Sequence, residues 1–142
     1  MSGGDAGYEF FEVEADVGVR AWGARAEDAF AQAALGVFAL VVDPAEVTAR
    51  EQREVRAQGD SDEALLVSFI NECLYVHEIE GFVVRRVDVD AFGGGMVHGV
   101  LSGEEFDRAR HRPGTIVKAA TFHDVRVTRA PGRVEVSVVL DV

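Results

Sequence analysis

At 142 residues, with 48% hydrophobic and 27% charged side chains, the chain is expected to fold as a single globular domain over residues 1–142. Its formal net charge of −11 argues against tight direct binding to nucleic acid, which depends on lysine and arginine contacts to phosphates. No apolar run approaches the roughly 20 residues of a membrane helix, and the single cysteine excludes an internal disulfide framework. We therefore expect a soluble, cytoplasmic protein that does not contact a membrane.

The first half of the chain predicts a strand, a helix and a second strand. Residues 12–23 alternate between apolar and polar side chains, which is typical of a half-buried strand, with a break near Asp16. Residues 26–42 carry apolar side chains at helical spacing, and Asp43-Pro44 ends that helix. Residues 47–57 are rich in charge and alternate poorly, which favours an edge strand.

The second half predicts a longer helix followed by two pairs of strands. The helix covers residues 60–78; Asp60 is expected as its N-cap with Glu63 completing a capping box, and Cys73 lies in its apolar stripe as a core residue. The strands cover residues 82–91, with a bulge at Arg85-Arg86, and residues 96–102, 117–127 and 134–142; glycines 93–95 turn the chain between the first two. Two helices among about six or seven strands predict an α+β two-layer sandwich, with both helices packed on a mostly antiparallel or mixed sheet.

Acidic side chains near both ends of the sequence are the first candidate site. In the strand over residues 134–142, the phase of the apolar residues places Asp141 on the face away from the core. Glu12, Glu14 and Asp16, at a spacing of two, are expected on one strand face about 7 Å apart. Together with Asp141 and the main-chain carboxylate of Val142, they offer the oxygen ligands that calcium or magnesium prefers. A solvated acidic edge is the alternative, and the spacing does not decide between the two.

Histidines are the second group of candidates, as acid–base or metal-binding side chains. His123 shares a strand face with apolar residues, which favours a hydrogen-bonded core histidine. His111 lies in the arginine-rich loop RARHRPG, where a functional role and a simple surface role fit equally well and where RNA could be contacted locally. His77 is interpreted as a favourable charge at a helix C-terminus, and His98 has no partner in view.

Four stretches, taken in order, resemble the archease family. The first, YEFFEVEADVGVRAWG, resembles the family's opening, F-D-H-T-A-D-V-G-I-x-A-x-G. The next two, AEDAFAQAALGVFALVVD and LLVSFINECLYVHEIEGFVV, resemble its two helices and the strand that follows them. The last, GEEFDRARHRPGTIVKAATFHDVRV with the final VVLDV, resembles G-E-x-x-D-x-x-x-H, V-K-A-x-T-(Y/F)-H and V-x-L-D-(I/V). The chain departs from the family at Val13, where the family has histidine, and at Phe122, where tyrosine is usual.

The resemblance implies a function and a set of site residues. Archeases are non-enzymatic activators of the RtcB-type tRNA-splicing ligase, and they promote its guanylylation and its repeated turnover. The family's metal site, reported as calcium, implies a divalent-cation site at Asp16, Asp141 and Val142, with magnesium or manganese as alternatives. The further candidates for contact with the partner are Glu12, Glu14, His111, Lys118 and His123.

The resemblance thus predicts a protein that binds a ligase, reaches tRNA only through that ligase, and has no small-molecule substrate of its own. An acidic surface suits such a partner, because a protein that grips RNA and GTP must be basic and complementary charge speeds encounter. Two alternatives stay open. One is a small metal-dependent hydrolase or phosphotransferase that uses Asp16, Asp141 and His111; the other is a metal-free, chaperone-like binding module.

Overall fold

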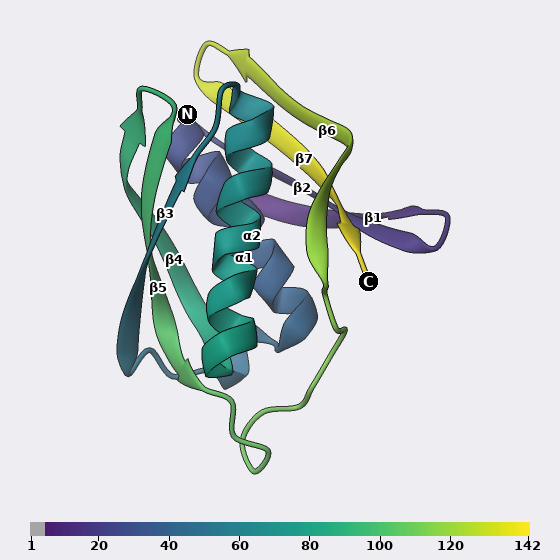
Figure 1. The fold of residues 1–142 in the computed structure, drawn as a ribbon, viewed down its shortest axis with the longest axis vertical. Helices are drawn as coiled ribbons and strands as arrows, with labels where there is room; N and C mark the ends of the chain where they lie inside the picture. The colour runs from purple at the N-terminus through teal and green to yellow at the C-terminus, as the bar shows by residue number, and fades with distance from the viewer. Residues whose placement is uncertain (1–4) are drawn as a thin grey trace.

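The computed structural model describes residues 5–142, which form two helices and seven strands (Figure 1). The helices are α1 (Ala26–Val41) and α2 (Asp62–Glu80), and a short 3-10 helix, η1 (Pro44–Glu46), follows α1. The strands are β1 (Gly7–Val13), β2 (Asp16–Gly23), β3 (Glu51–Gln58), β4 (Phe82–Gly93), β5 (Met96–Glu105), β6 (Ala119–Ala130) and β7 (Arg133–Asp141). Neither helix in this part of the chain is long and apolar enough to cross a membrane.

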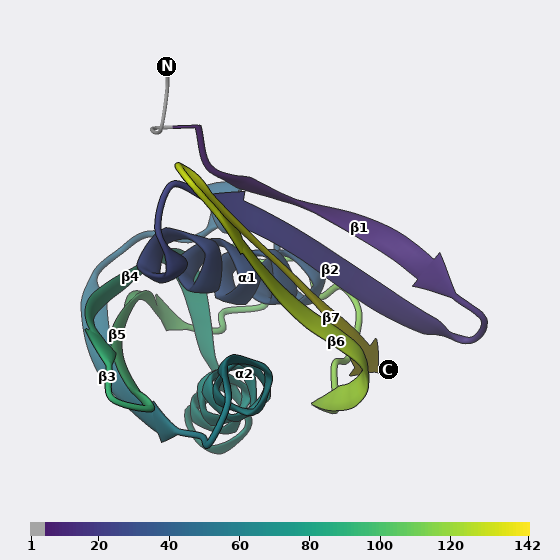
Figure 2. The same ribbon diagram turned by 90° about the horizontal axis from the view of Figure 1, so that it is seen from above.

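The seven strands form two antiparallel sheets with the helices between them (Figure 2). The first sheet has the order β1-β2-β7-β6 and the second the order β3-β5-β4. Helix α1 contacts β2 of the first sheet and β4 of the second, and α2 likewise contacts β6 and β3. The expected α+β class is confirmed, with the strands divided between two sheets because α1 is buried nearly all round and so needs a covering layer on both sides.

The core fills the space between the sheets. Phe30 and Phe38 of α1 and Leu66 and Ile70 of α2 are each at most 1% exposed. Burying a side chain of this size contributes about 1.5–3 kcal/mol relative to leaving it in water. Cys73 is also buried, which confirms the prediction that it is a core residue, and burial raises the pKa of its thiol. The apolar face of β7 joins the same core, as its alternation predicts.

The N-terminal strand differs from the sequence prediction. The break expected near Asp16 is a complete reversal of the chain: β1 ends at Val13, Glu14 and Ala15 turn, and β2 begins at Asp16. Glu14 has a φ of 50°, in the left-handed region that non-glycine residues rarely adopt. The alternation over residues 12–23 therefore belongs to two paired strands and not to one.

Helix α2 starts and ends slightly later than its predicted range. Its N-cap is Ser61, whose hydroxyl accepts a hydrogen bond from the Ala64 N–H at 3.0 Å. The predicted capping box of Asp60 and Glu63 is wrong, because Asp60 lies one residue too early to reach the free N–H groups of the first turn. The predicted bulge at Arg85, the glycine turn after β4 and the edge position of β3 are all confirmed.

Candidate functional site

Strand pairing brings Asp16 and Asp141 together at one corner of the first sheet. Strands β2 and β7 pair with Val17 opposite Leu140, so continuing that register by one residue places Asp16 opposite Asp141. Directly opposed residues of an antiparallel pair point to the same face, with Cβ atoms about 4.5–5.5 Å apart. Because Leu140 points into the core, both aspartates lie on the face away from the helices, where Asp141 is exposed and Asp16 is half-buried.

Lys118 and Val142 complete this corner. The main-chain N–H of Lys118 donates a hydrogen bond to the Asp141 carbonyl at 2.8 Å, and Ala119 stands opposite Asp141 in β6. Val142 packs against the core and so fixes the end of β7, as its place in the alternation predicts. The corner, which we call the carboxylate corner, consists of Asp16, Asp141, Val142 and Lys118. The side chain that replaces the family's histidine, Val13, stands directly opposite Asp16.

Contrary to the sequence prediction, Glu12 and Glu14 do not join this corner. Glu12 stands opposite Val17, which puts it on the other face of the sheet from Asp16. Glu14 lies in the turn between β1 and β2. The expected row of three acidic side chains on one strand face is therefore wrong, because the chain reverses between the second and third of them.

His111 is buried and braces a loop. Its Nε2 lies 2.9 Å from the Glu104 Oε2, and its Nδ1 accepts a hydrogen bond from the Asp107 N–H at 2.9 Å. The acceptor role of Nδ1 assigns the proton to Nε2, which donates to Glu104. The surface role considered for His111 is wrong, since its side chain is 0% exposed. Both ring nitrogens are engaged, so His111 holds the loop over residues 106–118 in place.

Glu104, the partner of His111, is not among the candidate residues that the sequence predicts. Its carboxylate is 3% exposed and accepts hydrogen bonds from Arg110 at 2.9 Å and from the Thr48 N–H at 2.8 Å. The Arg110 guanidinium first, then the Thr48 N–H and His111, lower the pKa of Glu104 to about 2. The signal was present in G-E-x-x-D-x-x-x-H, because Glu104, Asp107 and His111 are the three polar residues of that motif.

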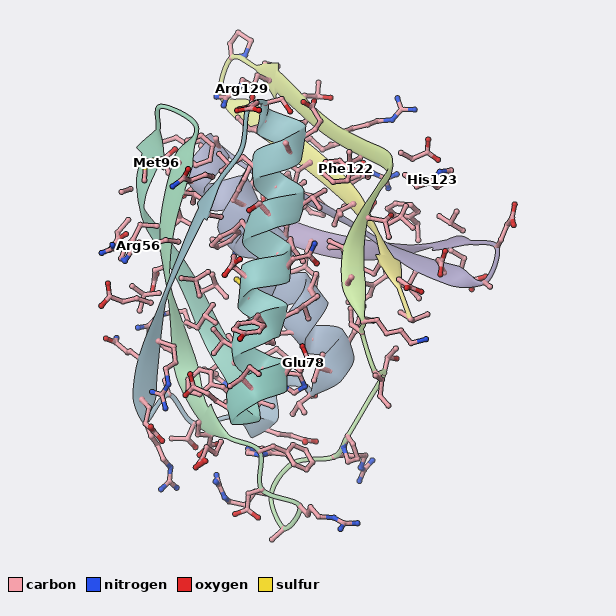
Figure 3. The ribbon with its side chains drawn as sticks, in the orientation of Figure 1. Arg56, Glu78, Met96, Phe122, His123 and Arg129 are labelled. Atoms are coloured by element: carbon pink, nitrogen blue, oxygen red, sulfur yellow. The ribbon has the colours of Figure 1, made fainter. Side chains whose placement is uncertain are left out.

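His123 is exposed, and the prediction of a core histidine is wrong. Its side chain is 67% exposed and its Nε2 lies 3.2 Å from Asp124 (Figure 3). The cause is a wide bulge in β6: Thr121 pairs with Val139 but Arg126 pairs with Ser137, so residues 122–125 stand opposite the single residue Val138. Asp124 in this bulge has a φ of 52°, and the alternation of faces is lost there.

The other two histidines have partners on neighbouring elements. The Nδ1 of His77 donates to the Phe82 carbonyl at 2.9 Å, in the last turn of α2 where the sequence places it. His98 in β5 contacts Asp90 through Nδ1 and Glu54 through Nε2, the second at 2.8 Å. These hydrogen bonds, that of Asp90 above all, raise the pKa of His98. His98 thus links three strands of the second sheet.

The donor atoms of the carboxylate corner suit a hard cation. Within residues 5–142, no three side chains of the histidine, cysteine, aspartate or glutamate type gather as a metal-binding group. The corner offers two side-chain carboxylates beside the main-chain oxygen of Val142, all oxygen donors of the kind that calcium and magnesium bind. Calcium takes about 6–8 oxygen ligands, so most of the shell would come from water or from a partner.

Comparison with known proteins identifies the family. The sequence profile of the archease protein family matches residues 8–142. A protein archease from Thermococcus gammatolerans is 40% identical over 127 residues, covering 87% of this chain and 89% of that protein. Another, from Saccharolobus islandicus, is 37% identical over 136 residues, covering 95% and 98%. The chain belongs to the archease family.

Two solved structures share the fold. The solution structure of protein 1598 from Methanobacterium thermoautotrophicum superposes with a TM-score of 0.78 at 31% identity, covering 96% of this chain and 99% of that one. The crystal structure of an archease from Thermotoga maritima, described as a possible chaperone, gives a TM-score of 0.61 at 19% identity, covering 93% and 94%. At that identity the second likeness supports the fold alone.

Proposed function

We propose that this chain is an accessory activator of an RtcB-type tRNA-splicing RNA ligase and not itself an enzyme. It promotes transfer of GMP from GTP to the ligase and allows repeated turnover; tRNA is reached through the ligase. Membership of the archease family supports this proposal. The observation that carries it is the convergence of Asp16, Asp141 and Lys118, from β2, β7 and the segment before β6, on one corner of the sheet.

The carboxylate corner is the part of the chain that we assign to activation. Asp16, Asp141 and the main-chain carboxylate of Val142 would hold one divalent cation, with calcium the first candidate and magnesium or manganese the alternatives. An activator accelerates a step only through contacts that are stronger in the reacting state than in the resting state. The corner must therefore meet the ligase near its nucleotide, where a bound cation would supply positive charge beside phosphate oxygens.

The hydrolase or phosphotransferase alternative is disfavoured by His111. A general acid or base must reach the proton that it transfers. His111 is buried, and its two ring nitrogens bond to Glu104 of β5 and to the Asp107 N–H rather than to any group of the carboxylate corner. A chaperone-like binding module would not increase the number of turnovers per ligase, so the ligation reaction described next distinguishes it from an activator.

The test is a ligation reaction with the cognate RtcB-type ligase and an excess of RNA and GTP. With the wild-type chain present, product should accumulate to many turnovers per ligase. Asp16→Ala and Asp141→Ala should return it to about one turnover while melting close to the wild type. Met96→Ala, an exposed apolar residue on the distant β4–β5 hairpin, is the control (Figure 3). If product stays at one turnover with the wild-type chain, using a ligase that another archease does activate, the assignment is wrong.

A further inference from the structure

An apolar strip runs along the outer side of α2 beside β6. Tyr75 and Ile79, one helical turn apart on α2, are 58% and 63% exposed. Phe122 of the β6 bulge is 65% exposed, and Ile116, in the segment before β6, is 80% exposed. These are four of the six large apolar residues that are exposed in the described part of the chain, and they lie on α2 and on β6 with the segment before it, two elements that pack against each other. We call this strip, with Glu72 and Glu78, the α2–β6 face.

The residues of this face adjoin one another. Phe122 lines a shallow groove with Ser68 and Glu72 of α2, and Ile116 lines a second hollow with Glu78 and Lys118. Tyr75 stands three residues after Glu72 and three before Glu78, a spacing that makes them neighbours on a helix surface. Figure 3 shows Phe122 between β6 and α2, and Glu78 farther along the same helix.

The face is held rigid by a two-point contact between α2 and β6. The Asn71 side chain accepts a hydrogen bond from the Ala120 N–H at 2.7 Å and donates one to the Ala120 carbonyl at 3.3 Å. Phe122 follows two residues later, where the β6 bulge directs it out of the core. A surface that is already ordered loses little conformational entropy on binding, so its apolar contacts convert more fully into affinity.

The charge of the face selects the kind of partner. Within residues 5–142, no basic side chain lies within salt-bridge distance of Glu72 or Glu78, and both carboxylates are exposed. Nucleic acid is disfavoured, since carboxylates repel phosphates. A second copy of this chain is also disfavoured, because a two-fold interface sets the same patch against itself and would oppose like charges. A basic protein surface with an apolar recess fits both features.

We propose that the α2–β6 face is the docking surface for a basic, apolar region of the RtcB-type ligase, with Tyr75 and Phe122 as its aromatic anchors. This inference rests on the proposed function and assigns it a second surface. Lys118 connects the two, because it lines the hollow beside Ile116 and its N–H bonds to Asp141. Docking through the α2–β6 face would thus bring the carboxylate corner to the ligase.

The test measures binding and activation separately. By titration with the purified ligase, Tyr75→Ala and Phe122→Ala should each raise Kd about tenfold or more, as central aromatic contacts do. Glu72→Lys with Glu78→Lys should slow association about tenfold at low salt and less at high salt. Met96→Ala is the matched control, an exposed apolar side chain on another face. Asp141→Ala should bind normally and fail to activate.

Each outcome decides one of the two proposals. If the wild-type chain activates the ligase but Tyr75→Ala and Phe122→Ala bind as tightly as the wild type, this surface is wrong and the function stands. If the wild-type chain neither binds nor activates, the function itself fails. Sedimentation of the isolated chain tests whether a second copy of the chain binds this face. A dimer that Tyr75→Ala converts to a monomer would assign the face to self-association and overturn the proposal.

Discussion

Glu104 shows how a single buried carboxylate fixes a loop. It receives hydrogen bonds from Arg110, His111 and the Thr48 N–H, and Arg50 lies 3.1 Å away, so two separate stretches of chain meet at this one side chain of β5. A buried charge is tolerated only when it is paired and hydrogen-bonded in this way. Removing either side of the arrangement leaves the other buried without compensation.

The low pKa of Glu104 makes stability depend on pH. Its folded value of about 2 lies below the ordinary 4.5, so the carboxylate stabilises the fold above the unfolded value and loses this contribution as pH falls from about 5 to 2. The contribution is about 3 kcal/mol at neutral pH. We expect Glu104→Gln to lose roughly this amount at pH 7 and to approach the wild type near pH 2, measured by urea unfolding. The exposed neighbour Glu105→Gln is the control; a deficit of Glu104→Gln that stays constant from pH 7 to pH 3 contradicts this account.

The carboxylate corner makes a prediction about metal ions. If Asp16, Asp141 and Val142 hold one divalent cation, the folded state gains about 2.7 kcal/mol when the ion is present at a hundredfold excess over Kd. Asp141→Asn, or one residue appended after Val142, should remove most of the gain while leaving the metal-free melting temperature nearly unchanged. Asp124→Asn, on the exposed β6 bulge, should keep it. A wild-type melting temperature that ignores calcium, magnesium and manganese alike would rule out the cation site.

At the scale of elements, β6 is the edge of the first sheet, and α2 covers part of it. An edge strand has unpaired N–H and carbonyl groups that another chain can bind. The Asn71 amide satisfies both groups of Ala120, so the helix takes the place of a neighbouring strand at that point. The same contact sets the position of the α2–β6 face.

Asn71→Ala should therefore lower the free energy of unfolding by more than is usual for a half-buried side chain. Two backbone groups of the buried Ala120 lose their partner, at a cost of about 1–3 kcal/mol. Hydrogen exchange of the Ala120 amide should accelerate by more than that of its neighbours in β6. Ser68→Ala, one turn earlier on α2, is the control and should change neither quantity. An unaltered exchange rate at Ala120 would mean that Asn71 does not secure the edge.

Most elements could be predicted from the sequence because their signals are local. Both helices, the glycine turn and the bulge at Arg85 follow from apolar spacing and residue type within a few positions. The reversal at Glu14 and the bulge at Asp124 were not foreseen as such, because glutamate and aspartate take left-handed φ values there in place of the usual glycine or asparagine. An alternating pattern predicts the face of a residue only where the strand is regular, so the predicted faces of Glu12 and His123 are wrong.

At the scale of the whole molecule, long-range pairing decides what local pattern does not. The division into two sheets depends on which strand edges meet around the helices. The burial of His111 depends on Glu104 of β5, which is held in turn by the Thr48 N–H. The carboxylate corner was predictable in part: the alternation of β7 gives the face of Asp141, and the family resemblance supplies Asp16 as its partner. Its metal and its role in activation stay predictions.

Taken together, the two proposals give the molecule two surfaces with separate tasks, one for docking and one for activation. The acidic net charge of −11 favours encounter with a basic partner. The α2–β6 face would supply affinity, and the carboxylate corner would act on the nucleotide step. If this division holds, binding and activation are separable by mutation.

The most direct measurement is the rate at which the purified ligase takes labelled GMP from GTP, with and without this chain. We expect the wild-type chain to raise the rate of ligase–GMP formation well above that of the ligase alone. Met96→Ala should match the wild type, and Asp141→Ala should fall to the rate of the unassisted ligase. Equal rates with and without the wild-type chain, for a ligase that another archease accelerates, would show that this chain is not an activator of guanylylation.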